Sequence, residues 1–280
     1  MAGVELVAPA PLTEDALERI HSRAYVQAVK TGTPRRLAES SGFPWDPGIW
    51  SAVRASNGGA VAAALEALAT GTNAGTLSSG LHHARRGSGA GFCTFNGLAL
   101  AARAALDAGA RRVLILDLDA HVGDGTMDIV AAWTRVTHVD IAVSPWSAPA
   151  GDPSRSSLDA VALAGDYLPT LERRLGALDT SGLDLCIYNA GMDPHEDCDL
   201  GGLPGLTTEV IRRRERMVFA WARGAGVPVA FVLAGGYAGG ALSRDALVDL
   251  HRQTIEEAAA GSAAAASCAG DRSGTRSVNP

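Results

Sequence analysis

The chain has 280 residues, of which 47% are hydrophobic and 19% are charged, and its formal net charge is -6. This size allows one α/β domain with a large core, and the acidic balance argues against nucleic acid or an anionic membrane surface as a partner. The sequence shows neither a signal-peptide pattern nor a run of about 18 apolar residues, so we expect a cytoplasmic protein.

The expected secondary structure alternates helices with short apolar strands. Residues Thr13 to Lys30 and Gly48 to Gly71 are predicted to form two helices, joined by a Gly-, Pro- and Trp-containing loop (Ser41 to Pro47) that could rim a pocket. Further helix-compatible stretches are Gly97 to Gly109, Leu158 to Leu178 and Thr207 to Gly224. Runs too short for a helix and expected to be buried strands are Val113 to Asp117, Val139 to Val143, Leu185 to Asn189 and Val227 to Leu233. This alternation predicts an α/β fold, with a mainly parallel sheet covered by helices on both faces.

Composition also sets the expected limits of the domain. Residues 1–257 are predicted to form a single domain. From Ala258 the chain is rich in Ala, Gly and Ser and then polar, so residues 258–280 are expected to be a disordered tail. The single lysine, Lys30, beside many arginines and alanines is typical of a bacterial gene rich in G and C.

Residues that could hold a metal ion follow two of the predicted strands. Asp119 and His121 come after the strand that ends at Asp117, and residues i and i+2 of an extended segment point to the same side. Asp193 follows the strand that ends at Asn189, and the carboxyl ends of strands converge in open α/β sheets. Three protein ligands leave a coordination position open, as in catalytic sites, and a set of carboxylates with an imidazole suits Zn²⁺ or Fe²⁺.

Simpler interpretations of these residues stay open at this stage. The aspartates after Asp117 could form a solvated loop with a turn at Gly123 to Gly125, and Asp193 could merely begin a turn before Pro194. Nearby polar residues expected at the rim of the site rather than among its ligands are His195, Asp197 and Asp199.

Two adjacent histidines and a tyrosine are candidates for catalysis. His82 and His83 could hold and transfer protons, each oriented by a carboxylate, for which Asp117 and Asp124 are available. Tyr237 stands on a glycine-rich turn after the last strand, where its hydroxyl could donate to an oxyanion. The alternatives are structural histidines and an exposed aromatic residue.

Five segments in order resemble one known family. They are His82 to Ala84, Gly91 to Asn96, Asp117 to Gly125, Ala190 to Asp193 and Gly235 to Tyr237. Together they resemble the histone deacetylase and acetylpolyamine amidohydrolase family, and the resemblance runs from about Ile20 to Arg252.

The resemblance implies an arginase/deacetylase-type three-layer α/β/α fold and zinc-dependent hydrolysis of an N-acyl amide. It implies Asp119, His121 and Asp193 as zinc ligands, with the paired histidines, their two aspartates and Tyr237 as catalytic residues. Substrate contacts are expected at Gly91, Phe92, Gly235 and Gly236. A structural K⁺ near Asp117, with Ser144 contributing, is a further expectation. The substrate would be an acyl-lysine, an acetylated polyamine or a small acetylated metabolite.

Three departures from the family pattern qualify these expectations. The chain has no match to an N-terminal strand and helix of the family, so a second subunit could cover a sheet edge in a homo-oligomer. Val122 replaces an imidazole after the second metal ligand, which is expected to alter the surroundings of the site rather than its ligands. Asp46 is displaced from the position of an acidic residue that grips peptides, which puts peptide substrates in doubt.

Two other functions are compatible with parts of this pattern. An arginase-like hydrolase would need a carboxylate where Gly123 stands and a second aspartate where His195 stands. A non-catalytic scaffold that binds an acylated ligand would not need Tyr237 or the two histidines.

Overall fold

The four apolar runs predicted to be strands lie side by side in the centre of one parallel sheet. The computed structural model describes residues 4–144 and 156–270, and within them the sheet has the strand order β1-β6-β5-β2-β3-β4. The strands are β1 (Ala74–Thr76), β2 (Arg112–Asp117), β3 (Val136–Ala142), β4 (Ser156–Ala160), β5 (Leu183–Gly191) and β6 (Val229–Ala234). Short strands β1 and β4 form the edges.

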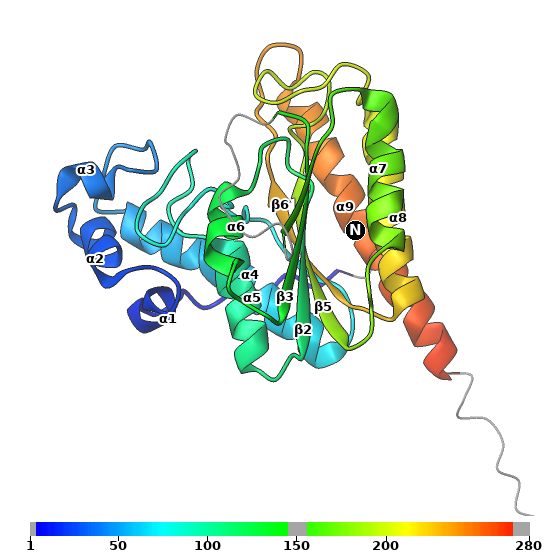
Figure 1. The fold of residues 1–280 in the computed structure, drawn as a ribbon, viewed down its shortest axis with the longest axis horizontal. Coiled ribbons are helices and arrows are strands. Elements are labelled where there is room, and N and C mark those ends of the chain that lie inside the picture. Colours follow the sequence, from blue (N-terminus) through cyan, green and yellow to red (C-terminus); the bar gives the residue numbers. More distant parts are fainter. Residues whose placement is uncertain (1–3, 145–155, 271–280) are drawn as a thin grey trace, which may run out of the picture.

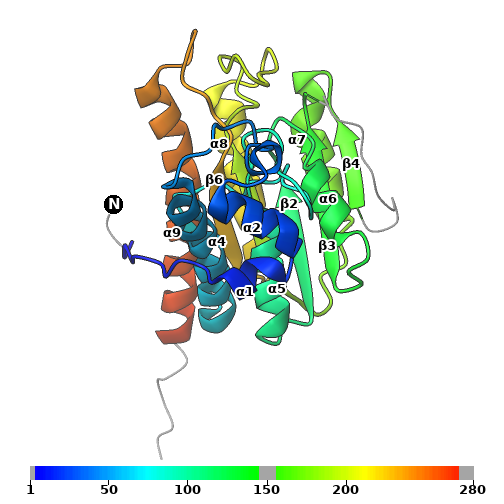
Figure 2. The same cartoon turned by 90° about the vertical axis from the view of Figure 1, so that its left-hand side faces the viewer.

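Helices cover both faces of this sheet (Figure 1). On one side lie α1 (Glu14–Glu18), α2 (Arg23–Thr31), α3 (Arg35–Ala38), α4 (Ile49–Thr70), α5 (Gly97–Asp107) and α6 (Asp124–Val130). On the other side lie α7 (Ala164–Gly176), α8 (Thr208–Ala225) and α9 (Arg244–Gly270). Figure 2 shows the first of these layers from its outer side. In the part of the chain that the structure describes, no helix is both long and apolar enough to cross a membrane.

Alternating side chains of the central strands build two separate cores. Val113 and Ile115 of β2 pack with residues of α4 and α5, whereas Leu114 and Leu116 pack with residues of α7 and α8. Successive side chains of a strand point to opposite faces, so a continuous apolar run serves both cores. The three layers and the parallel sheet confirm the predicted fold class.

The stretch Thr13 to Lys30 is two helices rather than the one that we predicted. Helix α1 ends at Glu18, and Ser22 begins α2, where its hydroxyl accepts a hydrogen bond from the Tyr25 backbone N–H at 3.3 Å. The Ser22 backbone N–H also donates to the Arg86 carbonyl at 2.8 Å. A serine that caps a new helix and a distant backbone partner together interrupt the pattern.

The predicted helix from Leu158 to Leu178 was wrong at its start. Residues Leu158 to Ala160 belong to strand β4, which pairs in parallel with β3, and helix α7 begins only at Ala164. Pairing with an existing sheet edge overrides the weak helical preference of so short a segment.

The C-terminal boundary also differs from the expectation. Helix α9 continues to Gly270, beyond the point at which composition predicted a disordered tail. Alanine is the strongest helix former, so an alanine-rich segment extends a helix that packing has already begun. The remainder of the expected tail, residues 271–280, lies outside the described residues.

Candidate active site

The three predicted metal ligands lie together beyond the carboxyl ends of the neighbouring strands β2 and β5. His121 Nδ1 lies 3.0 Å from Asp193 Oδ2 and 3.1 Å from Asp119 Oδ1. The Ala120 backbone N–H donates to Asp193 Oδ1 at 3.0 Å, which joins the two segments that carry the ligands. Both carboxylates are buried, and one donor atom from each of the three residues lies within 4.8 Å of the others.

The charges of this cluster call for a cation. Burial raises the pKa of Asp193, and the negative charge of Asp119 adds to this effect, so that the pKa reaches about 7. Burial lowers the pKa of His121, but hydrogen bonds to the two carboxylates outweigh burial and raise it to about 9. Two buried carboxylates that lie close together are thus stabilised by a nearby positive charge, which a divalent ion would supply.

A glycine keeps the space beside the two carboxylates open. Gly235 follows strand β6 with a φ of +54°, and a Cβ at this position would lie 2.2 Å from Asp193 Oδ1 and 2.9 Å from Asp119 Oδ2. Any side chain would therefore occupy the place next to the carboxylate oxygens. Two carboxylates and an imidazole around a gap that only glycine preserves fit an ion of the Zn²⁺ or Fe²⁺ type.

Each of the two adjacent histidines is paired with its own aspartate. His82 Nδ1 lies 2.9 Å from Asp117 Oδ2, and His83 Nδ1 lies 2.9 Å from Asp124 Oδ1. Burial opposes a charge on His82, but the charges of Asp117 and Asp119 prevail and raise its pKa well above the usual value. Burial and then the charge of His82 lower the pKa of His83. The environment therefore favours a charged His82 beside a neutral His83.

Two residues that we did not single out from the sequence hold these aspartates. Arg85 Nη2 donates to Asp124 Oδ2, and Asn189 Nδ2 donates to Asp117 Oδ1 at 2.7 Å. Arg85 lies two residues after the histidine pair, and Asn189 ends a predicted strand, so their places in the motifs were the available signals.

A buried amide shapes the loop that carries the histidines. Asn96 Nδ2 donates to the backbone carbonyls of His82 and Ala84, at 3.2 and 3.0 Å. The Asn96 backbone N–H donates to His21 Nε2 at 3.0 Å, while His21 Nδ1 lies 2.9 Å from the Arg85 carbonyl. His21 therefore carries its proton on Nδ1 and connects the backbone of Arg85 with that of Asn96. Its position in the sequence did not indicate this role.

Of the residues expected to contact the substrate, Gly91 lies beside His83. Gly91 has a φ of +50°, and a Cβ there would lie 2.5 Å from Cδ2 of His83. Phe92 has a φ of +64°, which is rare for a bulky residue, and it is 50% exposed. Its ring centroid lies 5.4 Å from that of Phe43 in the predicted rim loop. The two rings form an apolar wall open to solvent.

Tyr237 is half-buried against the core formed with α7, α8 and α9. Burial, followed by the negative charges of Asp119 and Asp193, raises the pKa of its phenol, which keeps the hydroxyl protonated. Gly236 precedes it with a φ of +91°, and a Cβ there would lie 2.4 Å from Leu247 Cδ1. The turn after β6 thus requires glycine both for its conformation and for its packing.

Two residues that depart from the family pattern, Val122 and Asp46, make local structural contacts. Val122 is fully buried and packs with Met127 and Ala142 in a small apolar cluster. Asp46 accepts a hydrogen bond from the Gly48 backbone N–H at 2.7 Å, so it stabilises its own loop.

The structural K⁺ near Asp117 stays a prediction. The Ser144 backbone N–H donates to the Ala120 carbonyl at 2.7 Å. The side chains of His138 and Asp140 lie close to that of Asp117.

His195 was expected at the rim and is buried. Its Nε2 lies 3.0 Å from the Thr208 hydroxyl, at the start of helix α8. Asp197 and Asp199 are exposed, in agreement with a place at the surface.

A buried arginine of helix α8 contacts both segments that carry the metal ligands. Arg214 Nη1 donates to the carbonyls of Gly191 and Leu118, at 2.7 and 3.3 Å. Its Nε donates to Glu215 Oε1 at 2.7 Å, and the same oxygen accepts from the Tyr188 hydroxyl at 2.7 Å. Both charged side chains are fully buried. Arg214 therefore connects the ends of β2 and β5 to helix α8.

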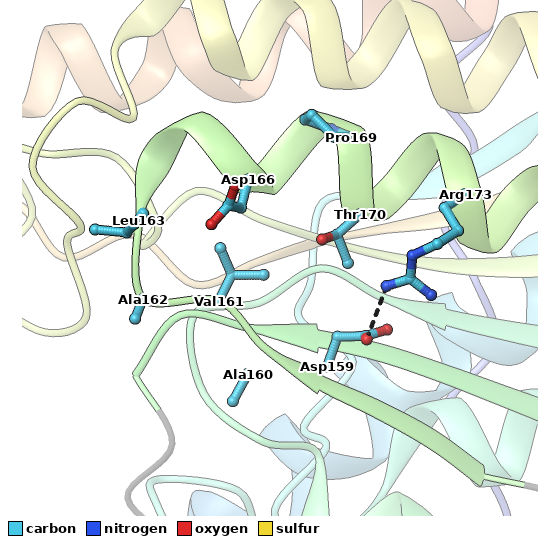
Figure 3. Close-up of a pocket in the computed structure, with 9 residues that line it drawn as sticks. All are labelled: Asp159, Ala160, Val161, Ala162, Leu163, Asp166, Pro169, Thr170 and Arg173. Atoms are coloured by element: carbon cyan, nitrogen blue, oxygen red, sulfur yellow. Dashed lines mark hydrogen bonds and ion pairs between the residues drawn. The ribbon is translucent and has the colours of Figure 1, made fainter.

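A surface pocket elsewhere contains none of the predicted site residues (Figure 3). It lies between strand β4 and helix α7, and two of its three charged residues, Asp159 and Arg173, form an ion pair at 3.1 Å. Asp159 also forms an ion pair with Arg174, so two arginines compensate its charge.

Comparisons with known proteins agree on one family. Residues 1–146 match the histone deacetylase domain. An uncharacterized protein of Picosynechococcus sp. is 37% identical over 79% of this chain and 75% of that protein. Histone deacetylase 2 of Arabidopsis thaliana is 29% identical over 89% of this chain and 68% of that protein. The structure of acetylpolyamine aminohydrolase from Burkholderia pseudomallei matches with a TM-score of 0.72 and 21% identity, over 90% of this chain and 84% of that one.

Proposed function

Because this chain belongs to the histone deacetylase family, we propose that it hydrolyses an N-acyl amide with a divalent ion held by Asp119, His121 and Asp193. The observation that carries the proposal is the position of the histidine pair next to this cluster. His82 Nε2 lies 3.6 Å from Asp119 Oδ1. The proposed acid-base groups therefore lie next to the proposed metal ligands, which supports hydrolysis of an amide.

The chain's own residues divide the proton transfers and the charge stabilisation. When bound, the ion supplies Lewis acidity that polarises a carbonyl and lowers the pKa of water. His83 accepts the proton of the attacking water at Nε2, because its Nδ1–H donates to Asp124. The same ring then returns a proton to the nitrogen of the leaving amine as the C–N bond breaks. His82, kept charged by Asp117, stabilises negative charge nearby.

Tyr237 completes this division of roles. Its phenol keeps its proton and is proposed to donate a hydrogen bond to the carbonyl oxygen as negative charge develops there. Hydrogen-bond donors of this kind stabilise a transition state by roughly 3–4 kcal/mol.

The proposed substrates are acyl-lysine, an acetylated polyamine or a small N-acetylated metabolite. The wall of Phe92 and Phe43 is apolar and open to solvent, which suits a short acyl group on a polar amine. A screen of acyl amides with zinc-loaded protein identifies the substrate. The proposal fails if zinc is present and none of these amides is hydrolysed.

The roles are tested by His83→Ala. General acid-base catalysis contributes about 10²- to 10⁴-fold, so kcat should fall by at least roughly 100-fold while zinc occupancy stays unchanged. His195→Gln is the matched control, because His195 contacts Thr208 rather than the metal cluster, and it should retain turnover. An unchanged kcat in His83→Ala would refute the assignment of the base.

The same measurements distinguish the two other functions. A scaffold would bind acylated ligands without turnover. An arginase-like enzyme would hydrolyse a guanidinium substrate, and it needs a carboxylate at a position where this chain has Gly123. In the structure the Gly123 backbone N–H donates to Asp140 Oδ2 at 2.7 Å.

A further inference from the structure

The turn between strand β6 and helix α9 has little backbone support of its own. It contains Gly235 and Gly236, whose φ angles are +54° and +91°, and then Tyr237. Among the residues that the structure describes, residues 235–238 take part in no backbone-to-backbone hydrogen bond. The Cys198 thiol contacts the Tyr237 backbone from a neighbouring loop. Because two adjacent glycines have a wide choice of conformations, the direction of the Tyr237 side chain depends on side chains of other elements.

Helix α9 supplies such contacts from one of its faces. Leu247 and His251 are four residues apart, so they lie on the same side of the helix. A Cβ at Gly236 would lie 2.4 Å from Leu247 Cδ1 and 3.5 Å from His251 Nε2, so both side chains lie against the turn. The Gly235 carbonyl accepts a hydrogen bond from the His251 ring. Leu247 thus makes an apolar contact with the turn, and His251 makes a polar one.

The ring of His251 is neutral, and one of its nitrogens has no partner. Burial lowers the pKa of His251 to about 4, and the positive charge of Arg214 adds to this effect. Nδ1 is buried without a hydrogen bond among the described residues, so the nitrogen that donates to Gly235 is Nε2. A buried acceptor without a partner lowers stability, and an apolar side chain would avoid this cost. The contact with the turn, rather than packing, therefore accounts for a histidine at this position.

We propose that His251 is a positioning residue, which fixes the turn at Gly235 so that the phenol of Tyr237 faces the proposed metal ligands. The turn lies next to these ligands, because a Cβ at Gly235 would lie 2.2 Å from Asp193 Oδ1. A small shift of this backbone would move the phenol away from the carbonyl oxygen to which it is proposed to donate. The effect on catalysis rests on the proposed function, whereas the effect on the turn does not.

A double-mutant cycle tests the role of His251 in catalysis. His251→Leu removes the donor, and kcat should fall by roughly tenfold, as for the loss of one neutral hydrogen bond, while KM and zinc content stay unchanged. In a Tyr237→Phe background the same change should lower kcat by less than about twofold, because the phenol is already absent. His251→Gln offers an amide N–H in place of the ring N–H and should recover most of the activity. Arg252→Gln is the matched control, because Arg252 is an exposed neighbour on the same helix.

A second measurement follows the phenol itself and needs no turnover. The chain has four tyrosines, and the three besides Tyr237 are fully buried: Tyr25, Tyr167 and Tyr188. In protein labelled with fluorotyrosine, the fluorine NMR resonance that is lost in Tyr237→Phe belongs to Tyr237. His251→Leu should shift or broaden this resonance and leave the other three in place. His251→Gln and Arg252→Gln should leave all four in place.

The outcomes separate this proposal from the proposed function. If the zinc-loaded parent hydrolyses no amide, the proposed function fails, and the fluorine spectrum still decides whether His251 holds the turn. The proposal is overturned if the Tyr237 resonance is unchanged in His251→Leu. It is also overturned if an active enzyme keeps its kcat in His251→Leu, or loses the same factor in both backgrounds. Circular dichroism confirms the fold of each variant, and His251→Asn, whose side chain is too short to reach Gly235, gives the same test if the leucine variant does not fold.

Discussion

Replacing Arg214 with methionine should destabilise the fold, because it removes a buried cation that has several partners. The guanidinium donates to Glu215 and to the carbonyls of Gly191 and Leu118. Methionine has a similar length but no charge and no donor, so Glu215 would remain in the interior as an unpaired anion, and the two carbonyls would lose a partner.

The expected cost follows from these contacts. Removing one member of a buried ion pair typically costs about 3–5 kcal/mol, because the other charge stays desolvated. Each kcal/mol lowers the melting temperature by roughly 2–4 °C in proteins of this size, so a decrease of about 10 °C is expected. Adding Glu215→Gln to Arg214→Met removes the orphaned charge and keeps an acceptor for the Tyr188 hydroxyl. The double variant should therefore regain part of the lost stability.

Urea unfolding followed by tryptophan fluorescence measures these differences, since the chain has five tryptophans. Arg213→Met is the matched control, because Arg213 is an exposed neighbour on the same helix, and it should change stability by less than about 0.5 kcal/mol. The reasoning would be wrong if Arg214→Met cost less than 1 kcal/mol, or if the double variant were less stable than the single one.

Three further outcomes are expected. Tyr237→Phe should lower kcat by roughly 100-fold or more with unchanged zinc content, and near-native turnover would exclude the phenol as oxyanion donor. Hydroxamates should inhibit, since they chelate an ion with an open coordination position, and zinc-loaded enzyme that resists them would indicate a closed site. The pKa of His21 is lowered by burial to about 4, so the unfolded chain takes up a proton below pH 6.5 that the folded chain refuses. Above pH 6.5 the ring is neutral in both states and does not reduce stability. The free energy of unfolding should therefore fall by about 2 kcal/mol between pH 6.5 and pH 5. His21→Gln should lose this part of the pH dependence in urea unfolding, and an identical pH dependence in parent and variant would contradict it.

Much of the fold and of the candidate site could be predicted from local sequence patterns. Apolar runs identified the four central strands, because a strand buried on both faces needs apolar residues at every position. Asp119, His121 and Asp193 could be grouped because parallel strands bring their carboxyl ends to one edge of the sheet. The pairing of each histidine with an aspartate followed from the need to orient a ring that transfers protons, and the structure places Asp117 and Asp124 at those positions.

Other features were decided only by contacts between distant parts of the chain. Strand β4 exists because the edge of β3 is available for pairing, and the break after α1 depends on a backbone bond from Ser22 to Arg86. The sequence of one strand does not indicate that His138 and Asp140 lie near Asp117. The register between β3 and β2 brings the three side chains together. Arg214 stands among other arginines in the sequence, and only the packing of α8 buries it against carbonyls far away in the chain. Sequence patterns report which face of an element is apolar, whereas the partner of a buried charge is determined by the tertiary packing, because charge is compensated in space and not along the chain.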